Sequence, residues 1–312
     1  MARPTALISL LALCLWAWGQ GFAMEGTAPA TMRGTARLTL YARAGARTIA
    51  APMRKGAFRL EGSVEEATAA RLDVGHGTPL YLWVENAAMT VEYDPQRPAA
   101  SRVVGSRANS EYRYALEQCG TQPEDLLHYA AQHLDQPFVP FLLWLHYHGD
   151  DAQRLEALCD RLAGPATQAY HLPLLRQRAE AMRHSAEGQP IPSFEAPLPN
   201  GDLIPYDSLH RADRSTYLLF ATTWMEQEQR LLDSLRQRID TTQAQALWVA
   251  VDKHPSAWDA PCMQQLDIPY LPYLILVSPN GIIERRDVRV WELNDRNNAP
   301  RHITTPKKRT QP

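Results

Sequence analysis

The first part of the chain alternates apolar and polar residues with a period of two. Between residues 34 and 104 the alternation recurs in short runs, which turn-forming pairs such as Lys55-Gly56 separate. Successive side chains of a strand point to opposite faces of a sheet, so this alternation predicts half-buried strands. The predicted strands are 37–41, 57–60, 70–74, 80–84 and 89–93. We therefore expect a small antiparallel β domain, built as a sandwich, over residues 24–106.

The pattern changes to helical spacing after the β domain. Leu155, Leu158 and Leu162 recur at intervals of three and four, which places them on one face of a helix. Similar apolar stripes recur through residues 107–186, which we interpret as a helical connector.

A third pattern follows a proline-rich stretch at residues 187–199. Short apolar runs alternate with an amphipathic segment and end in an Asn280-Gly281 turn, which predicts a βαβ unit followed by a hairpin. The predicted elements are strands 217–222, 246–251, 273–277 and 282–287, with helices over 224–239 and 256–266. Residues 187–293 are thus expected to form an α/β domain, and the basic segment 294–312 a disordered tail.

The N-terminus has the composition of an export signal. Arg3 precedes an apolar stretch that is too short to span a bilayer, and small residues follow it. We predict a signal peptide over residues 1–23, cleaved after Ala23, with cleavage after Gly19 as the alternative. Cys14 faintly resembles a lipoprotein site, but the large Leu13 before it makes a lipid anchor the less favoured interpretation. No other apolar run is long enough to cross a membrane.

Composition and charge exclude several classes of function. The 312 residues carry a net charge of −2, so no basic field attracts nucleic acid, and no such partner is expected. The four cysteines include no close pair, which excludes a zinc ribbon and any CxxC dithiol. The ten histidines are scattered without ligand spacing, so neither a metal nor another cofactor is expected.

The last third of the chain resembles a known family. The segments 188–194, 217–224 and 271–281 resemble three parts of the thioredoxin-like domain of periplasmic and lipoprotein thiol–disulfide oxidoreductases, close to the peroxiredoxin-like group. These parts are its leading G-x-x-x-P-x-F segment, the strand before the redox site, and the proline loop with its strand. Residues 105–109, Gly-Ser-Arg-Ala-Asn, resemble the end of a β-rich domain of unknown function that often precedes it. The resemblance implies a thioredoxin-like α/β fold for residues 187–293.

The chain departs from this family at the redox site. The family places C-x-x-C after a tryptophan, whereas Trp224 is followed here by Met225-Glu226-Gln227-Glu228. Met225 and Glu228 thus stand at the two cysteine positions, and neither side chain can form a thiolate or a disulfide. The same residues indicate a capping box with Thr223 as N-cap and Glu226 at N3. Glu228 is then expected to be a solvated residue of the first helical turn, with a catalytic acid as the less favoured interpretation.

Although the dithiol is absent, the resemblance still implies a binding surface next to its position. Pro272 aligns with the family's cis-proline, which lies beside the redox site and holds an extended substrate segment; Pro269 is the rival position. We therefore take Trp224, Met225, Pro272 and Tyr273 as binding-surface candidates. The family usually ends in an amphipathic helix, for which residues after 287 offer few apolar positions.

The remaining cysteines leave alternatives open. Cys262 is a candidate for a lone reactive thiol, although a buried bystander is the commoner case. Cys159 lies on an apolar helical stripe, and a Cys119–Cys159 disulfide is an option in an oxidising compartment.

The leading functional hypothesis is an exported, redox-inactive binding or scaffold module of the cell envelope, either periplasmic or associated with the outer envelope. Its expected partner is a protein or an extended peptide. One alternative is a thiol oxidoreductase or peroxidase-like enzyme that uses Cys262. A second alternative is a structural envelope protein that docks through the β domain.

Overall fold

The computed structural model describes residues 21–120, 122–255 and 260–293. The chain divides into two compact units. Unit 1 comprises Met1–Gly149 and Gln153–Gln177, and unit 2 comprises Asp150–Ala152 and Arg178–Pro312. The alternative cleavage site after Gly19, Cys14 and the basic tail lie outside the described residues, whereas the favoured site after Ala23 lies within them.

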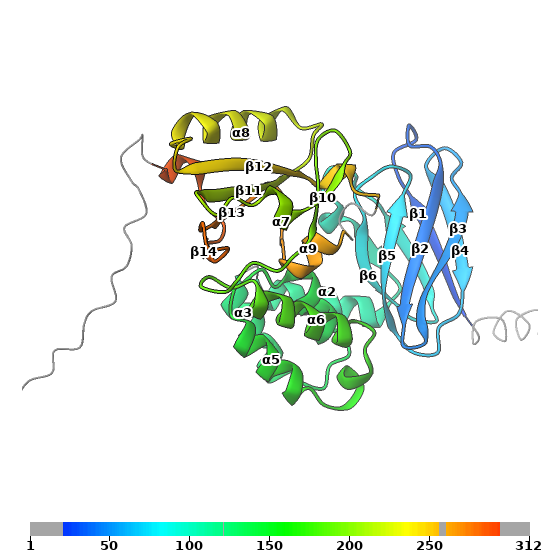
Figure 1. Ribbon diagram of the computed structural model, residues 1–312. Helices are drawn as coiled ribbons and strands as arrows, with labels where there is room; N and C mark the ends of the chain where they lie inside the picture. Colours follow the sequence, from blue (N-terminus) through cyan, green and yellow to red (C-terminus); the bar gives the residue numbers. More distant parts are fainter. Residues whose placement is uncertain (1–20, 121, 256–259, 294–312) are drawn as a thin grey trace, which may run out of the picture. The chain divides into compact units, whose positions relative to one another are not determined.

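Two four-stranded sheets form the first half of unit 1 (Figure 1). One has the strand order β4-β1-β7-β8 and the other the order β3-β2-β5-β6. Their strands are β1 (Phe22–Thr27), β2 (Thr35–Ala42), β3 (Gly45–Pro52), β4 (Ala57–Gly62), β5 (Thr68–Val74), β6 (Leu80–Val84), β7 (Ala88–Glu92) and β8 (Arg102–Val104). Buried side chains from both sheets, including Leu38, Leu72 and Met89, form a single core. The five strands predicted from alternation are confirmed.

Strand β1 was not among the predicted strands. It pairs antiparallel with β4 and parallel with β7, and Ala23 lies opposite both Glu61 and Ala88. Apart from this one parallel pair, the paired strands of the two sheets run antiparallel. A Cβ at Gly26 in β1 would lie 1.9 Å from the Phe58 ring, so any larger residue there would force that buried ring to move. The β domain therefore begins at Phe22, two residues before its predicted start.

Helices follow the sheets, as the apolar spacing predicts. They are α2 (Arg107–Cys119), α3 (Pro123–Gln132), α4 (Val139–His146), α5 (Ala152–Arg161) and α6 (His171–His184). The Ser106 side chain caps α2 by accepting from the Asn109 backbone N–H at 3.0 Å. The Asn109 side chain in turn accepts from the Trp83 backbone N–H at 3.0 Å, which ties α2 to strand β6. Within the described residues, no helix combines the length and the apolar character that crossing a bilayer would need.

Unit 2 is built on a mixed sheet with the order β12-β11-β13-β14. Its strands are β11 (Ser215–Ala221), β12 (Ala244–Ala250), β13 (Tyr273–Val277) and β14 (Ile283–Arg285). The β11–β12 pair is parallel and connected by α8 (Glu226–Arg238), whereas β13 pairs antiparallel with β11 and β14. This arrangement confirms the predicted α/β architecture.

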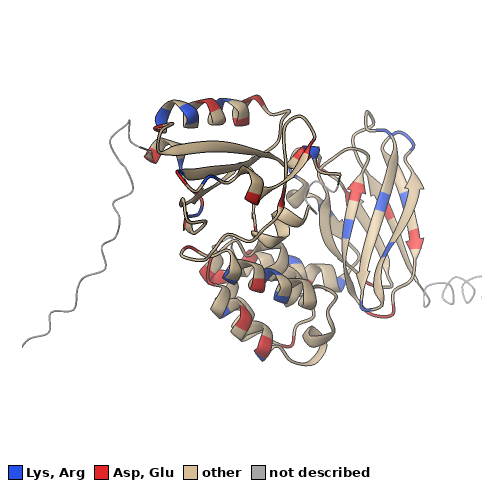
Figure 2. Cartoon of the chain, viewed as in Figure 1, with Lys and Arg blue, Asp and Glu red and all other residues tan. Residues whose placement is uncertain are grey.

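Different elements cover the two faces of this sheet. Helix α8 lies along one face (Figure 1), where Leu232 and Leu235 join the buried strand residues. The short hairpin of β9 (Glu195–Pro197) and β10 (Leu203–Pro205), with α7 (Tyr206–Leu209) and α9 (Pro261–Gln265), contributes to the core of the other face. Figure 2 shows charges of both signs along α8, in keeping with a solvated outer side. After β14, the described residues contain a 3-10 turn, Val290–Glu292, where the resemblance implies an amphipathic helix.

Candidate functional site

Three chain segments meet at one edge of the unit 2 sheet. The parallel strands β11 and β12 end together, with Ala221 opposite Ala250. On the other side of β11, Phe220 lies opposite Tyr273, so the residues after Ala221 continue beside the peptide that leads into β13. The Leu271–Pro272 peptide bond is cis. The register therefore brings the β11–α8 turn next to the proline loop.

The side chains at this edge differ sharply in exposure. Trp224 is 73% exposed, Pro272 is exposed and Met225 is half-buried. Tyr273, the fourth predicted surface residue, is only 6% exposed because it faces the core, with the Tyr270 ring 5.3 Å from its own. The exposed surface at this edge thus comprises Trp224, Pro272 and part of Met225, whereas the Tyr273 side chain is buried.

The first turn of α8 is built differently from the predicted capping box. The N-cap is Met225, not Thr223, and no side chain caps it. Glu228 occupies N3 and is 3% exposed, so the expectation of a solvated side chain was wrong. Its carboxylate accepts from the Thr222 backbone N–H and, at 2.8 Å, from the Thr222 hydroxyl. Glu228 therefore ties α8 to the end of β11, and this is why burying the carboxylate is tolerated.

A second carboxylate holds Thr223, and the sequence interpretation missed it. Asp252 follows β12 and accepts from the Thr223 backbone N–H and hydroxyl, each at 2.7 Å. Burial raises the pKa of Asp252, but the Thr223 hydrogen bonds and the Lys253 charge outweigh it and hold the pKa below its usual range. The sequence did contain a signal for Asp252, because it follows a buried strand and the carboxyl ends of parallel strands lie at the same edge of a sheet.

The cysteines lie away from solvent. Cys119, Cys159 and Cys262 are all free and buried, so the structure contains no Cys119–Cys159 disulfide. Cys262 lies in α9 and is 1% exposed, and burial raises the pKa of its thiol to about 11. Burial likewise raises the pKa of Cys159 to about 11. A reactive cysteine needs the opposite environment, exposed and electropositive.

The turn before α8 carries no cysteine, and the carboxylates near it are already hydrogen-bonded. The Met225 thioether stands at the helix start where a thiolate would be activated, and it has no proton to lose. Both nearby carboxylates, Glu228 and Asp252, already accept two hydrogen bonds each. Within the described residues, no group of three or more histidine, cysteine, aspartate or glutamate side chains is arranged to hold a metal ion.

Comparisons with known proteins concern the fold. No known family's sequence profile and no curated protein matches the chain. Among solved structures, a thioredoxin-like protein from Bacteroides caccae is similar over 60% of this chain and 80% of its own, at 10% identity and a TM-score of 0.37. A thiol-disulfide oxidoreductase from Bacteroides fragilis is similar over 32% and 91%, at 19% identity and a TM-score of 0.25.

A third solved structure is the thioredoxin domain of a thiol-disulfide oxidoreductase from Bacteroides vulgatus. It is similar over 35% of this chain and 92% of its own, at 16% identity and a TM-score of 0.28. All three identities and TM-scores are low, so the description of unit 2 depends on its own strand order and on its cis-proline before β13. Unit 2 has a thioredoxin-like fold.

Proposed function

We propose that this protein is an exported binding module of the cell envelope whose thioredoxin-like unit contacts an extended protein segment without dithiol chemistry. The main support is the pairing of a 73% exposed Trp224 with an exposed cis-proline loop at a site that lacks a thiol. A large exposed aromatic ring beside an accessible backbone favours contact with a partner.

The firm anchoring of the loop also supports binding. Thr222 and Thr223, which precede Trp224, are each held through backbone and side chain by Glu228 and Asp252. A loop fixed in this way presents its tryptophan with little conformational entropy left to lose on association. The buried hydrogen bonds thus preorganise the loop for contact with a partner.

Site-specific photocrosslinking tests the proposal. A benzoylphenylalanine at position 224 is compared with the same probe at Trp291, an equally aromatic position of unit 2 that is 67% exposed. We expect a defined adduct from position 224 that is absent from position 291, with one envelope protein crosslinked through one segment. The same products from both positions, or none from 224, would contradict the proposal.

Thiol chemistry provides the second test. Because the pKa of Cys262 is raised to about 11, only about one molecule in a thousand carries the thiolate at pH 8. We expect native protein to leave insulin disulfides intact and iodoacetamide to label Cys262 only after denaturation. Rapid labelling of folded protein, or insulin reduction that is lost in Cys262→Ser, would favour the lone-thiol enzyme instead.

A further inference from the structure

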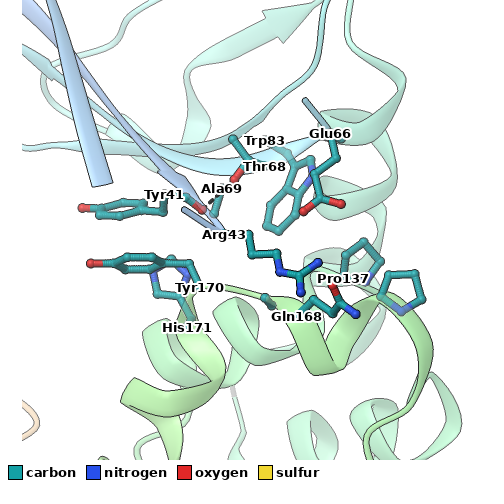
Figure 3. Close-up of a pocket in the computed structure, with 13 residues that line it drawn as sticks. Tyr41, Arg43, Glu66, Thr68, Ala69, Trp83, Pro137, Gln168, Tyr170 and His171 are labelled. Atoms are coloured by element: carbon teal, nitrogen blue, oxygen red, sulfur yellow. Dashed lines mark hydrogen bonds between the residues drawn. The ribbon is translucent and has the colours of Figure 1, made fainter. Parts of the chain in front are cut away.

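Unit 1 contains a hollow that has no room for a ligand. It lies between strand residues such as Tyr41 and Trp83 and the residues that lead into α6, and Figure 3 shows the Arg43 side chain lying across it. Its cavity volume is about 20 Å³, which is enough for one water molecule. In unit 2, by contrast, charged and polar contacts surround residues 266–272, which connect α9 to β13 and end in Pro272; we call them the α9–β13 loop.

The α9–β13 loop forms few backbone hydrogen bonds of its own. At its start the N–H groups of Leu266, Asp267 and Ile268 donate back to α9, whereas residues 269–272 form no backbone–backbone hydrogen bond with any other described residue. Asp267 has a φ of +43°, in the left-handed region that few residues other than glycine adopt. The position of the exposed Pro272 therefore depends on side chains that contact the loop.

One side chain contacts the chain at both ends of this loop. Arg286 follows β14, and its Nη2 donates to the carbonyl oxygens of Leu266 at 2.8 Å and Asp267 at 2.9 Å. Its guanidinium also lies over the Tyr273 ring, with Cζ 5.4 Å from the ring centroid. Leu266 and Asp267 begin the loop, and Tyr273 is the first residue after it. The Arg286 guanidinium therefore connects the start of the loop to its end.

Arg286 is itself held in place from the end of α6. Its Nη1 donates at 2.8 Å to both the carbonyl oxygen and the hydroxyl of Ser185, and its backbone N–H donates at 2.8 Å to the Glu187 carboxylate. The Ser185 hydroxyl in turn donates to the Leu266 carbonyl at 3.2 Å. Hydrogen bonds from a charged donor are stronger than neutral ones, and the planar guanidinium fixes their directions. The Arg286 side chain is thus a rigid support for the loop.

A buried ion pair holds the start of the loop independently of Arg286. Arg178, on α6, donates from Nε to the Asp267 carboxylate at 2.8 Å, and both side chains are 12% exposed. This pair binds the side chain of Asp267, whereas Arg286 binds its backbone carbonyl. Replacing Arg286 should therefore leave the start of the loop anchored and release the part near Pro272, which loses the support at Tyr273.

We propose that Arg286 is a positioning residue of the binding surface, which fixes Pro272 relative to Trp224. This inference rests on the proposed function, because it concerns how that surface is held before a partner binds. Glu228 and Asp252 anchor the Trp224 side of the surface, and Arg286 does the same for the Pro272 side. The Arg286 side chain is half-buried and directed at the loop, so it acts through Pro272 and not by touching the partner.

Spin labelling of the full chain measures how firmly the loop is held. A nitroxide is attached to Tyr270→Cys, an exposed loop position, in a Cys14→Ser background, because the three described cysteines are buried. We expect Arg286→Gln to raise the mobile fraction of the nitroxide spectrum at least about threefold, since local contacts set the local opening equilibrium. Arg285→Gln is the matched control, because its side chain is 52% exposed and pairs with Glu292 at 3.5 Å, and it should leave the spectrum unchanged.

Two further measurements separate positioning from a general loosening of unit 2. A nitroxide at Arg236→Cys, a 58% exposed position on α8, should keep its spectrum in Arg286→Gln. Photocrosslinking from position 224 should give at least about tenfold less adduct with Arg286→Gln than with Arg285→Gln, because a mobile loop loses more conformational entropy on association.

The outcomes for Arg286 and for the proposed function are distinct. An unchanged spectrum at position 270, an equal rise in mobility at position 236, or an unchanged adduct yield in Arg286→Gln would overturn the proposal. If the parent protein gives no adduct from position 224, the proposed function fails, whereas the nitroxide spectra still decide whether Arg286 holds the loop.

Discussion

Glu228 is a buried carboxylate that stabilises the junction between β11 and α8. It accepts two hydrogen bonds from Thr222, one from the backbone and one from the hydroxyl. Removing it leaves a partly buried N–H without its acceptor, and hydrogen bonds to charged groups contribute about 1.5–3 kcal/mol. We expect Glu228→Ala to lower the free energy of unfolding by about 2 kcal/mol, measured by urea denaturation.

Glu226 provides the matched control for that measurement. It lies one half-turn earlier on α8 and pairs with Arg230 at 2.6 Å, but the glutamate side chain is 79% exposed. Exposed pairs of this type contribute little, so Glu226→Ala should change the free energy of unfolding by less than about 0.5 kcal/mol. Equal effects of the two substitutions would show that burial of Glu228 adds nothing.

Helix α8 begins where the resembled family places its dithiol. Met225 is the N-cap and Glu228 is N3, so their spacing on the helix is that of a C-x-x-C pair. A thiol at a helix N-terminus has a lowered pKa because of the helix dipole and the free N–H groups. We expect Met225→Cys/Glu228→Cys to form an intramolecular disulfide and to reduce insulin, as followed by thiol titration and turbidity.

The single substitution Met225→Cys is the control, because one thiol cannot resolve a mixed disulfide. It should label readily with iodoacetamide at neutral pH yet support no insulin turnover. If the double variant folds and still forms no disulfide, the turn before α8 does not have the geometry that the resemblance implies.

Strand β1 bears on where the predicted signal peptide would be cleaved. Phe22 is 3% exposed in the sandwich core, and the Ala23 N–H donates to the Ala87 carbonyl at 3.1 Å. Cleavage after Ala23 would delete both residues, whereas cleavage after Gly19 leaves the strand whole. We propose the Gly19 site and expect sequencing of the exported protein to begin at Gln20.

Comparing two shortened chains separates stability from processing. A chain that starts at Met24 should unfold at least about 3 kcal/mol more easily than one that starts at Gln20, because losing a buried phenylalanine costs about that much. Equal stability would mean that the first two residues of β1 contribute nothing to the sandwich.

The elements also show which patterns the sequence reveals. Strand β13 was predicted at its observed limits because its five residues, Tyr273–Val277, are all buried and apolar. Strand β3, Gly45–Pro52, was missed because its residues are largely exposed and carry no alternation. β1 was missed because its apolar residues follow directly on the apolar stretch that predicts a signal peptide. At the site, Trp224 and Pro272 were found by resemblance, whereas Asp252 was missed although its place just after the predicted strand 246–251 was an available signal.

The two units should respond differently to acid. Burial lowers the pKa of His171 to about 3, and burial with a contribution from His148 lowers that of His146 to about 4. Both lie in unit 1. A histidine whose pKa is depressed on folding stabilises the fold above its unfolded pKa near 6.5, and this contribution is lost as the pH falls toward the folded value.

Hydrogen exchange can measure the loss of stability at low pH separately for each unit. Between pH 6.5 and 5, His171 alone should cost unit 1 about 2 kcal/mol, since one pH unit corresponds to about 1.4 kcal/mol. After correction for the intrinsic pH dependence of exchange, peptides from β5 and β6 should lose protection, and peptides from β11 and β13 serve as the internal reference. The loss should be smaller in His171→Phe, and an unchanged pH profile in that variant would contradict the assignment.

The pairing of β1 has a consequence for the order of events during synthesis. Its partners are β4, which ends at Gly62, and β7, which ends at Glu92, so the first strand to emerge acquires its second neighbour some 65 residues later. Such nonlocal pairing slows folding because the entropy of loop closure is lost before the contacts form. The first sheet therefore cannot be completed until most of the β domain has been synthesised.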